Sequence, residues 1–362
     1  MHARLRRPTV ELFSIPTERP ESDGTMAWDA TEVVLAEVHA DRSVGLGYTY
    51  GSPAVAAVVH GKLAAEIEGR DAMDIPGCWE AMRRAIRNLG RPGICSMAMA
   101  AVDLALWDLK AKLLNLPLAK LLGLVRDHVP IYGSGGFTSY SIAELQEQLG
   151  GWAEQGIAAV KMKVGREPVH DFERVRAARA AIGPDIALYV DANGAYSRQQ
   201  ARRFAEQFAA EGVTWFEEPV SSDDLEGLHW LRDRVPAGME IAAGEYGYEL
   251  AYFQHMLAAE AVHVQQADIT RCAGPSEFAR VDSQCAAYQT PLSAHTAPSA
   301  HLHPCCALER VRNIEYFHDH ARIESMLFDG ASQPRQGALW PDLSRPGIGL
   351  DLKTRDARRY AA

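Results

Sequence analysis

Ionisable side chains recur at the ends of short apolar runs through the second half of the chain. In order along the chain these are Lys161, Lys163, Asp191, Glu217, Glu245, Asp268, His295 and Glu315. From the second lysine onward, successive positions lie 20 to 28 residues apart, about the length of one β/α unit. Since parallel strands end at one common face, these side chains are predicted to converge there.

Three carboxylates from consecutive predicted strands, Asp191, Glu217 and Glu245, form the central part of this series. Converging carboxylates repel one another, so a cation must neutralise them. Oxygen ligands suit a hard divalent ion, and Mg²⁺ with open coordination positions is the usual choice. The alternative is that each carboxylate pairs with an arginine or caps a helix, without any metal.

Lys161 and Lys163 lie two residues apart in the apolar run AAVKMKV, so both side chains point to the same face of a buried strand. Two neighbouring ammonium groups beside a cation are expected to lower one another's pKa. A lysine with a lowered pKa can act as a general base. The alternative is a pair of surface lysines.

His295 and Asp268 end neighbouring predicted strands, which favours an acid/base dyad whose carboxylate fixes the imidazole tautomer. The alternative is a structural histidine. His301 and His303 follow in HTAPSAHLHP, a spacing that also occurs in zinc sites. No matching ligand cluster accompanies them, so they are interpreted as helix-start or core histidines.

The elements that position these residues form a regular series from about residue 129. Apolar runs such as VPIYGSG, IALYVDANG, TWFEEP and MEIAAGE alternate with helical segments in about eight β/α units. That alternation is typical of a parallel α/β barrel, in which catalytic groups stand at the carboxyl ends of strands. The ionisable series therefore coincides with the functional face of the predicted barrel.

The N-terminal part has a different pattern. Residues 9–50 are predicted to form strands interrupted by a long polar loop, PTERPESDGTMAW, and residues 54–122 are predicted to be helical. The tail LWPDLSRPGIGLDLKTRDARRYAA departs from the β/α pattern. It is expected to pack with the N-terminal part rather than with the barrel.

Composition indicates a globular protein with a full-sized core, since 47% of the 362 residues are hydrophobic and 23% are charged. The net charge of −10 argues against nucleic acid or an anionic membrane as a partner. Six cysteines without a paired spacing favour reduced thiols in a cytoplasmic protein. No apolar stretch suits a signal peptide or a membrane span.

Taken together, the motifs resemble those of the enolase superfamily, mandelate racemase subgroup (the mandelate racemase/muconate lactonizing enzyme family). The matching segments, in order, are KMKVG, VDANG, WFEEP, AAGE, QQAD, SAH, NIEYF and RPGIGLD. The resemblance implies an α/β fold, a modified (β/α)₇β TIM-type barrel over 129–328. It also implies an α+β capping domain over 1–128, completed by the tail 329–362.

The resemblance further implies a mechanism. Mg²⁺ held by the three carboxylates would bind a small carboxylate substrate, with Lys161 and a protonated Glu315 holding it and stabilising an enediolate intermediate. Lys163 would act on one face of the α-carbon. His295, oriented by Asp268, would act on the other.

Two outcomes remain open for such a site. Dehydration of an acid sugar to a 2-keto-3-deoxy acid is the first expectation, and racemisation or epimerisation of a 2-hydroxy acid (mandelate racemase-like) is the second. A cycloisomerase is disfavoured by the Asp268–His295 pair, and a zinc hydrolase by the lack of further histidines at strand ends. A non-catalytic barrel protein would have lost a ligand or a base.

Substrate choice is expected to depend on two cap loops, residues 16–28 and 47–53. Phe137, Thr138, Tyr246 and Thr296 are predicted to line the pocket. In ITRCAGPS, Ala273 precedes Gly274 where the family commonly has two glycines, which is expected to alter the pocket. A dimer or larger symmetric homo-oligomer is expected.

Overall fold

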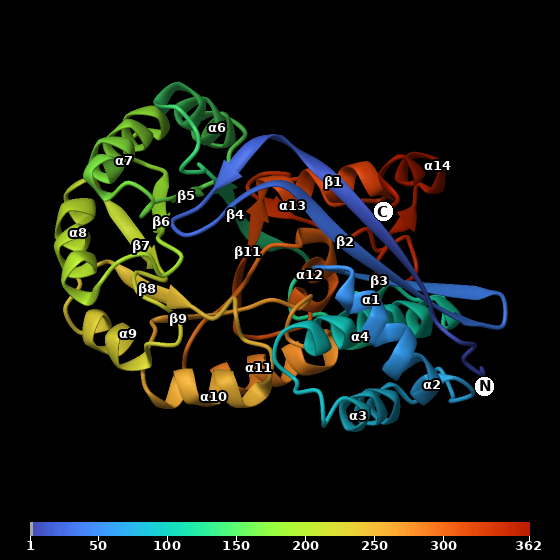
Figure 1. Cartoon of the computed structure of the whole chain (residues 1–362). Coiled ribbons are helices and arrows are strands. Elements are labelled where there is room, and N and C mark those ends of the chain that lie inside the picture. Colours follow the sequence, from blue (N-terminus) through green and yellow to red (C-terminus); the bar gives the residue numbers. More distant parts are fainter. Residues whose placement is uncertain (1–2) are drawn as a thin grey trace.

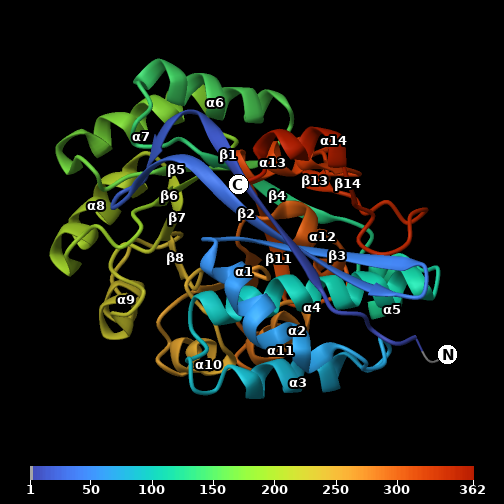
Figure 2. The ribbon, with the colours of Figure 1, turned by 45° about the vertical axis from the view of Figure 1, so that its right-hand side comes forward.

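The structure is a computed structural model that describes residues 3–362. It consists of a closed barrel of parallel strands and an antiparallel three-stranded sheet that lies across one mouth of the barrel (Figure 1). The two parts remain distinct when the molecule is turned (Figure 2). The predicted α/β barrel with an α+β cap is confirmed.

Eight parallel strands follow one another around the barrel in chain order, and the last pairs with the first. The strands are β4 (Val129–Gly135), β5 (Ala159–Lys163), β6 (Ala187–Asp191), β7 (Val213–Glu217), β8 (Glu240–Ala243), β9 (Val264–Ala267), β10 (Leu292–Ala294) and β11 (Val311–Phe317). The helices between and after them are α6 (Ile142–Glu154), α7 (Pro168–Ile182), α8 (Arg198–Ala210), α9 (Leu225–Arg232), α10 (Leu250–Ala258), α11 (Pro275–Ala287), α12 (Pro298–Cys305) and α13 (His318–Leu327).

Strand alternation separates a charged layer from the packed layer below it. On β5, β6 and β7, the residue two positions before a site residue faces the same side, into the barrel. Tyr132, Tyr189 and Trp215 meet there, with the rings of the last two stacked 5.0 Å apart. This aromatic layer fills the barrel beneath the charged mouth, so the barrel is a packed core and not a pore.

The cap begins with β1 (Thr9–Ser22), β2 (Ala27–Ala40) and β3 (Ser43–Tyr50). The long loop predicted over residues 16–28 is wrong, because β1 and β2 continue through most of it and leave a turn over 23–26. Strand β1 is an edge strand, so prolines in it break no ladder on its free side. A register shift between Pro16 and Glu21 absorbs the irregular stretch.

The turn of this hairpin docks on the barrel mouth near the ends of β5 and β6 (Figures 1 and 2). Gly24 lies so close that an added Cβ would stand 2.4 Å from the Ala192 carbonyl oxygen and 2.7 Å from that of Val164. Thr138, at the end of β4, donates its backbone N–H to the Ser22 carbonyl at 2.8 Å. The hairpin is thereby fixed over the ring of ionisable residues.

The predicted helical region contains a long buried helix, α4, flanked by shorter ones. These are α1 (Ala54–Val58), a π-helical turn (Val59–Leu63), α2 (Ala64–Ile67), α3 (Ile75–Ala85), α4 (Ile94–Leu113) and α5 (Leu118–Leu122). Helix α4 packs on β3, where a Cβ on Gly45 or Gly47 would stand 2.1 or 2.2 Å from a helix carbonyl. The glycines therefore permit the close packing of sheet and helix.

The C-terminal tail contacts both parts of the molecule. Its elements are β12 (Phe328–Asp329), β13 (Ala338–Leu339), β14 (Asp351–Leu352), α14 (Thr354–Ala357) and a 3₁₀ turn (Arg358–Tyr360). Ala362 donates to Leu12 in the cap, whereas β13 pairs with barrel strand β4. The expectation that the tail avoids the barrel is therefore wrong, while the domain limits at 128 and 328 stay a prediction.

The six cysteines are free and buried. Over residues 3–362, no helix is both long enough and apolar enough to cross a membrane.

Asp108 joins three segments and gives a stability prediction. Its buried carboxylate accepts from the N–H groups of Leu46 and Ile348, both at 2.8 Å, and pairs with Lys112 at 2.7 Å. Asp108→Ala should lower the free energy of unfolding by about 2–5 kcal/mol, because it leaves two backbone donors buried without partners. Urea denaturation measures this. Exposed Asp127→Ala is the control, and equal stabilities of the two variants would contradict the prediction.

Candidate active site

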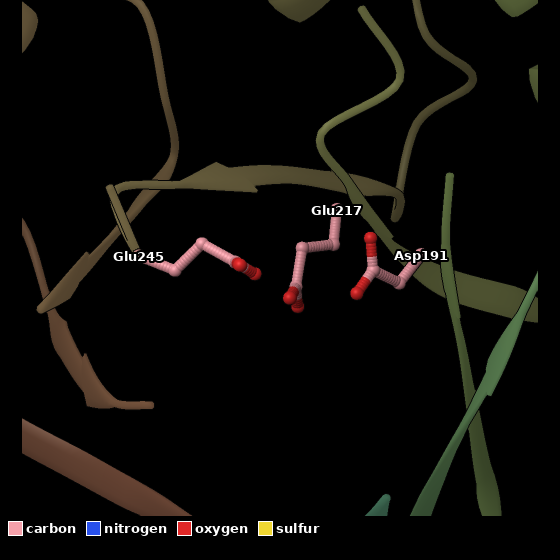
Figure 3. Close-up of side chains that lie close together, drawn as sticks. All are labelled: Asp191, Glu217 and Glu245. Carbon is pink, nitrogen blue, oxygen red and sulfur yellow. The ribbon is translucent and has the colours of Figure 1, made fainter. Parts of the chain in front are cut away.

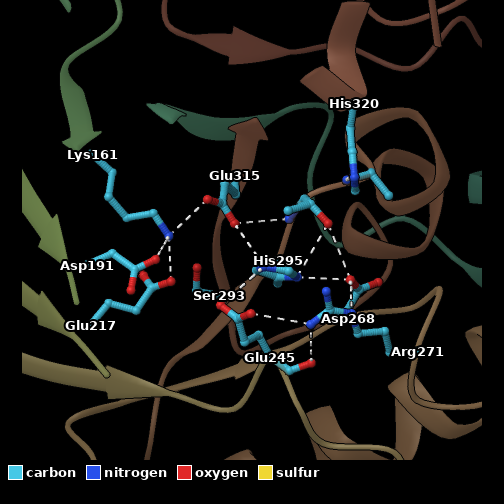
Figure 4. Close-up of polar contacts among 12 residues, drawn as sticks. Lys161, Asp191, Glu217, Glu245, Asp268, Arg271, Ser293, His295, Glu315 and His320 are labelled. Carbon is cyan, nitrogen blue, oxygen red and sulfur yellow. Dashed lines mark hydrogen bonds and ion pairs between the residues drawn. The ribbon is translucent and has the colours of Figure 1, made fainter. Parts of the chain in front are cut away.

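The eight predicted side chains lie together at the carboxyl-end mouth of the barrel, joined by ion pairs. All of them except Lys163 are labelled in Figure 4. All eight are at most 6% exposed. Strand β5 carries both lysines and β6, β7 and β11 carry carboxylates, whereas the remaining residues directly follow β8, β9 and β10. The regular spacing along the chain thus corresponds to one compact cluster.

Asp191, Glu217 and Glu245 point toward one another (Figure 3), with one oxygen of each within 4.8 Å of the other two. The buried Oε2 of Glu245 lies 3.4 Å from His295 Nε2. Three converging buried carboxylates are a donor set that fits a hard divalent cation. Nitrogen or sulfur ligands, which would favour zinc, are not part of the group.

Burial raises the pKa of Glu217, and repulsion from the charge of Asp191 raises it further, to about 8. The adjacent Glu218 is also buried, and burial together with Glu245 raises its pKa well above its usual value. A divalent cation bound by the three carboxylates would relieve this cost. The electrostatics therefore agree with the donor set in favouring a metal.

The two lysines balance the carboxylates directly. Lys161 Nζ lies 2.5 Å from Glu217 and 2.9 Å from Glu315, and Lys163 Nζ lies 2.5 Å from Asp191. Burial opposes the charged form of Lys163, but attraction to Asp191 outweighs it and raises the pKa. The carboxylates thus outweigh the neighbouring ammonium, and the lowering predicted beside a bound cation stays a prediction. A cation on Asp191 would weaken that attraction.

Glu315 lies between Lys161 and the backbone after His295. Burial favours its neutral form, but Lys161 and then His295 outweigh burial and hold its pKa at about 2. Its second oxygen accepts from the Thr296 N–H at 3.1 Å. The protonated form expected beside a bound substrate carboxylate stays a prediction.

The predicted dyad is present, with His295 Nδ1 at 2.9 Å from Asp268 Oδ2. The other oxygen of Asp268 accepts from the N–H and the hydroxyl of Thr270, both at 2.7 Å, which orients the carboxylate. Burial disfavours the imidazolium, but Glu245 and then Glu315 outweigh it and raise the pKa of His295 to about 9. The imidazole can therefore hold a proton ready for transfer.

Arg271 is a site residue that the sequence analysis missed. Its guanidinium lies 3.3 Å from Glu245, 3.7 Å from Asp268 and over the ring of Tyr246. It joins a proposed metal ligand to the dyad. The signal was its position three residues after Asp268, on the turn that leaves the same strand.

A cavity of about 530 Å³ lies between the cap and the barrel mouth, a usual size for a small-molecule site. The barrel contributes Lys163, Asn193, Glu245, Tyr246, Arg271, His295, Thr296, Glu315, Phe317 and His320. The cap contributes Ser14, Asp23, Met26, Trp28, Asp29, Ala30, Thr31, Glu32, Tyr50, Gly51 and Ser52. Both predicted cap loops therefore reach the cavity.

Two of the four predicted pocket residues, Tyr246 and Thr296, line this cavity. Phe137 and Thr138 do not, which corrects the prediction. Phe137 is fully buried behind Trp28, in edge-to-face contact at 5.6 Å. Thr138 instead holds the hairpin turn through its backbone and hydroxyl. The lengthened hairpin thus places cap residues where these two were expected.

Three other residues singled out in the sequence have structural contacts. Asn193 is in the left-handed region (φ +46°) and donates its N–H to Asp191 at 2.9 Å. Ala273 is also left-handed (φ +62°) and its carbonyl accepts from the buried Trp79. His303 accepts the Ala119 N–H at 3.2 Å, a core contact that agrees with the interpretation against zinc.

Two family models cover most of the chain. Residues 9–123 match the mandelate racemase/muconate lactonizing enzyme N-terminal domain, and residues 144–357 match the enolase C-terminal domain-like family. The chain belongs to the enolase superfamily. Within it, the N-terminal match places the chain in the mandelate racemase/muconate lactonizing enzyme family.

Among curated proteins, the chain is similar to L-talarate/galactarate dehydratase of Salmonella typhimurium, with 30% identity over 99% of this chain and 91% of that protein. It is also similar to 3,6-anhydro-alpha-L-galactonate cycloisomerase of Streptomyces coelicolor, with 32% identity over 96% and 97% of the two chains. A solved structure of a variant L-talarate/galactarate dehydratase is liganded with Mg and L-glucarate; its TM-score is 0.91 at 28% identity, over 100% and 93% of the chains.

A further solved structure has a higher identity. It is a mandelate racemase/muconate lactonizing enzyme-like protein from Rubrobacter xylanophilus, with 55% identity, a TM-score of 0.97 and coverage of 99% and 100% of the two chains. The likeness spans cap and barrel alike, so the family relation extends over both parts of the site.

The carboxylate cluster gives a metal-binding prediction. At a Mg²⁺ concentration roughly 100 times the Kd, binding should stabilise the EDTA-treated protein by about 2.7 kcal/mol. In Glu217→Gln this gain should be lost although the protein folds, because the amide resembles the protonated form that its surroundings favour. Calorimetric unfolding with and without Mg²⁺ measures the gain. Exposed Asp223→Asn is the control, and a full gain in Glu217→Gln would contradict the assignment.

Proposed function

We propose that this protein is a Mg²⁺-dependent enzyme that removes the proton next to a substrate carboxylate and dehydrates an acid sugar to a 2-keto-3-deoxy acid. One observation carries the proposal: Lys163 and His295, the latter bonded to Asp268, line one cavity beside the Asp191, Glu217 and Glu245 cluster. A general base, a second proton donor and a cation site are thus combined where one small molecule can reach all three.

Each side chain has a role that its contacts support. Bound Mg²⁺ would be held by the three carboxylates and would supply charge stabilisation for the enediolate. Lys161 donates a hydrogen bond to the substrate carboxylate. This bond replaces part of the contact between Lys161 and Glu315. Glu315 keeps Lys161 and the backbone of Thr296 in place.

Proton transfer is divided between two separated groups. Lys163, on β5, takes the α-proton, and the electrons of that C–H bond form the enediolate. His295, after β10, gives a proton to the β-hydroxyl as the carbon–oxygen bond breaks, so that one water leaves. The resulting enol becomes the 2-keto-3-deoxy acid when its C3 takes a solvent proton. Asp268 holds the imidazole with Nδ1 toward itself, so Nε2 is the nitrogen that acts on the substrate.

The cap side of the cavity supports a polyhydroxy acid over an aryl acid. Among the described residues, this wall includes Ser14, Asp23, Asp29, Thr31 and Glu32, all of which have side-chain oxygens. Substrate hydroxyls can donate to these oxygens, whereas an aromatic ring would desolvate them without a hydrogen bond in return. The likeness to a talarate/galactarate dehydratase points in the same direction.

Racemisation or epimerisation is the second candidate. It is favoured by the separation of Lys163 and His295 on strands with β4 and β11 between them, since a proton can leave one face of the α-carbon and return to the other. The cycloisomerase likeness adds an internal displacement as a third product type. All three begin with the same proton abstraction, so product analysis distinguishes them.

We also propose a symmetric homo-oligomer in the cytoplasm with no nucleic-acid or membrane partner. The net charge of −10 and six free buried cysteines support the compartment and the absence of polyanionic partners. Oligomers of closed symmetry are common among soluble enzymes.

Proton NMR in D₂O tests the proposed reaction. The enzyme with Mg²⁺ and a panel of aldonic acids, aldaric acids and mandelate should form a 2-keto-3-deoxy acid deuterated at C3. Lys163→Ala should lower both product and α-proton exchange by roughly 10²–10⁴-fold, because the base is lost. The His295→Asn variant should form no keto acid but should still exchange the α-proton with solvent. Lys120→Ala, exposed and remote, is the control. Unchanged turnover in the Lys163→Ala variant would contradict the assignment of Lys163 as the base. Exchange of the α-proton without keto acid in the wild type would indicate racemisation.

The charge of the cap wall gives a prediction about substrate class. Asp23, Asp29 and Glu32 are among the residues that line the cavity, and among described residues the cap contributes no Lys or Arg to its lining. A second carboxylate at the far end of the substrate would be repelled. We expect kcat/KM for a six-carbon aldonate to exceed that for the matching aldarate by about tenfold, or about 1.4 kcal/mol. The double variant Asp29→Asn/Glu32→Gln should narrow the difference in kcat/KM between the two substrates. The control variant Asp41→Asn should leave that difference unchanged. A preference for the aldarate in the wild type would refute this.

A further inference from the structure

His301, on α12, is a buried histidine with both ring nitrogens engaged. Its Nε2 lies 2.9 Å from the backbone nitrogen of Ile269, and its Nδ1 lies 3.0 Å from the carbonyl oxygen of Thr296 and 3.1 Å from that of Ala297. The ring has no solvent exposure and packs edge-to-face against Phe278 at 5.2 Å. These contacts use its whole hydrogen-bonding capacity.

The partners determine the tautomer. A backbone N–H can only donate, so Nε2 accepts from Ile269, and Nδ1 must carry the proton that it donates to a carbonyl. Burial, followed by weaker opposing effects, lowers the pKa of His301, which agrees with a neutral ring. A neutral imidazole with one donor and one acceptor therefore bridges two backbone segments.

The two bridged segments carry the dyad. Ile269 directly follows Asp268, and Thr296 directly follows His295. The ladder between β9 and β10 ends where His295 donates its N–H to the Ala267 carbonyl. Beyond that point the two loops leave the barrel, and the ring of His301 joins them.

The loop after His295 needs such support. Thr296 and Ala297 are consecutive non-glycine residues in the left-handed region, with φ of +51° and +39°. This conformation is costly and persists only when surrounding contacts hold it. His301 contacts the carbonyls of both residues, so it fixes the backbone that directs the imidazole of His295.

We propose that His301 is a positioning residue that sets the geometry between Asp268 and His295 and thereby the proton transfer assigned to His295. The inference rests on the proposed division of labour between Lys163 and His295. His303, two residues further along α12, is a natural contrast. It is also buried, but within residues 3–362 its ring has a hydrogen bond from Ala119 and none with either dyad loop.

The experiment compares His301→Leu, His301→Gln and the matched control His303→Leu in D₂O, on a substrate that the wild type dehydrates. His301→Leu should slow keto acid formation roughly 10–100-fold, because small displacements of catalytic groups cost about that much. Exchange of the α-proton by Lys163 should persist, so the ratio of exchange to dehydration rises. His301→Gln, with an oxygen near the Nε2 position, should be intermediate. His303→Leu should leave the ratio within about twofold.

Equal losses of exchange and dehydration in His301→Leu would overturn the proposal, as would the same rise in ratio in His303→Leu. If His301→Leu does not fold, His301→Gln carries the comparison.

Nitrogen-15 spectra of histidine-labelled protein provide a readout that needs no substrate. We expect His301 with its proton on Nδ1 and His295 with both ring nitrogens protonated in the wild type, and we expect the His295 signals to shift in the His301 variants. A proton on Nε2 of His301, or an unchanged His295 signal, would reject the bridge. If the wild type neither exchanges the α-proton nor forms keto acid, the proposed function is contradicted. The nitrogen-15 spectra would still test whether His301 bridges the two loops.

Discussion

Repulsion among buried carboxylates is the constraint on which the rest of this structure depends. Asp191, Glu217 and Glu245 are brought within a few ångströms of one another, at a cost visible in the raised pKa of Glu217. Only a rigid frame holds like charges in that way. The closed ladder of parallel strands supplies the frame, and the aromatic layer beneath it prevents the side chains from moving down into the barrel. Lys161 and Lys163 supply the balancing charge from a single strand.

The cap follows from the same constraint. A cluster of charges open to bulk water would be screened, and its control over a weakly acidic α-proton would be lost. The β1–β2 hairpin covers the mouth, and its turn is locked to the barrel through Gly24 and Thr138. Its inner surface then becomes one wall of the cavity. The ionisable residues on the barrel and the cavity wall on the cap are therefore physically separate parts of one site.

The sequence predicted the barrel and all eight ionisable positions because strand-end spacing is a local, repeating property. It failed where the outcome depended on contacts between distant segments. Residues 16–28 were expected to be a loop, since their prolines and charges disfavour strands, yet an edge strand tolerates them. Arg271 lacked a signal beyond its nearness to Asp268.

The division between dehydration and racemisation does not lie in the acid/base residues. Lys163 and His295 can serve both reactions, and the enediolate is common to both. What differs is the group that the proton on His295 meets: a β-hydroxyl in one case and the α-carbon in the other. That choice depends on how the substrate chain lies beneath Trp28, which Glu21 holds through a 2.9 Å hydrogen bond to its indole nitrogen. In the dehydration proposed above, a polar wall that bound hydroxyls along the chain would turn the β-carbon toward the dyad. Reaction type in this fold is thus a consequence of cap recognition as much as of catalytic chemistry.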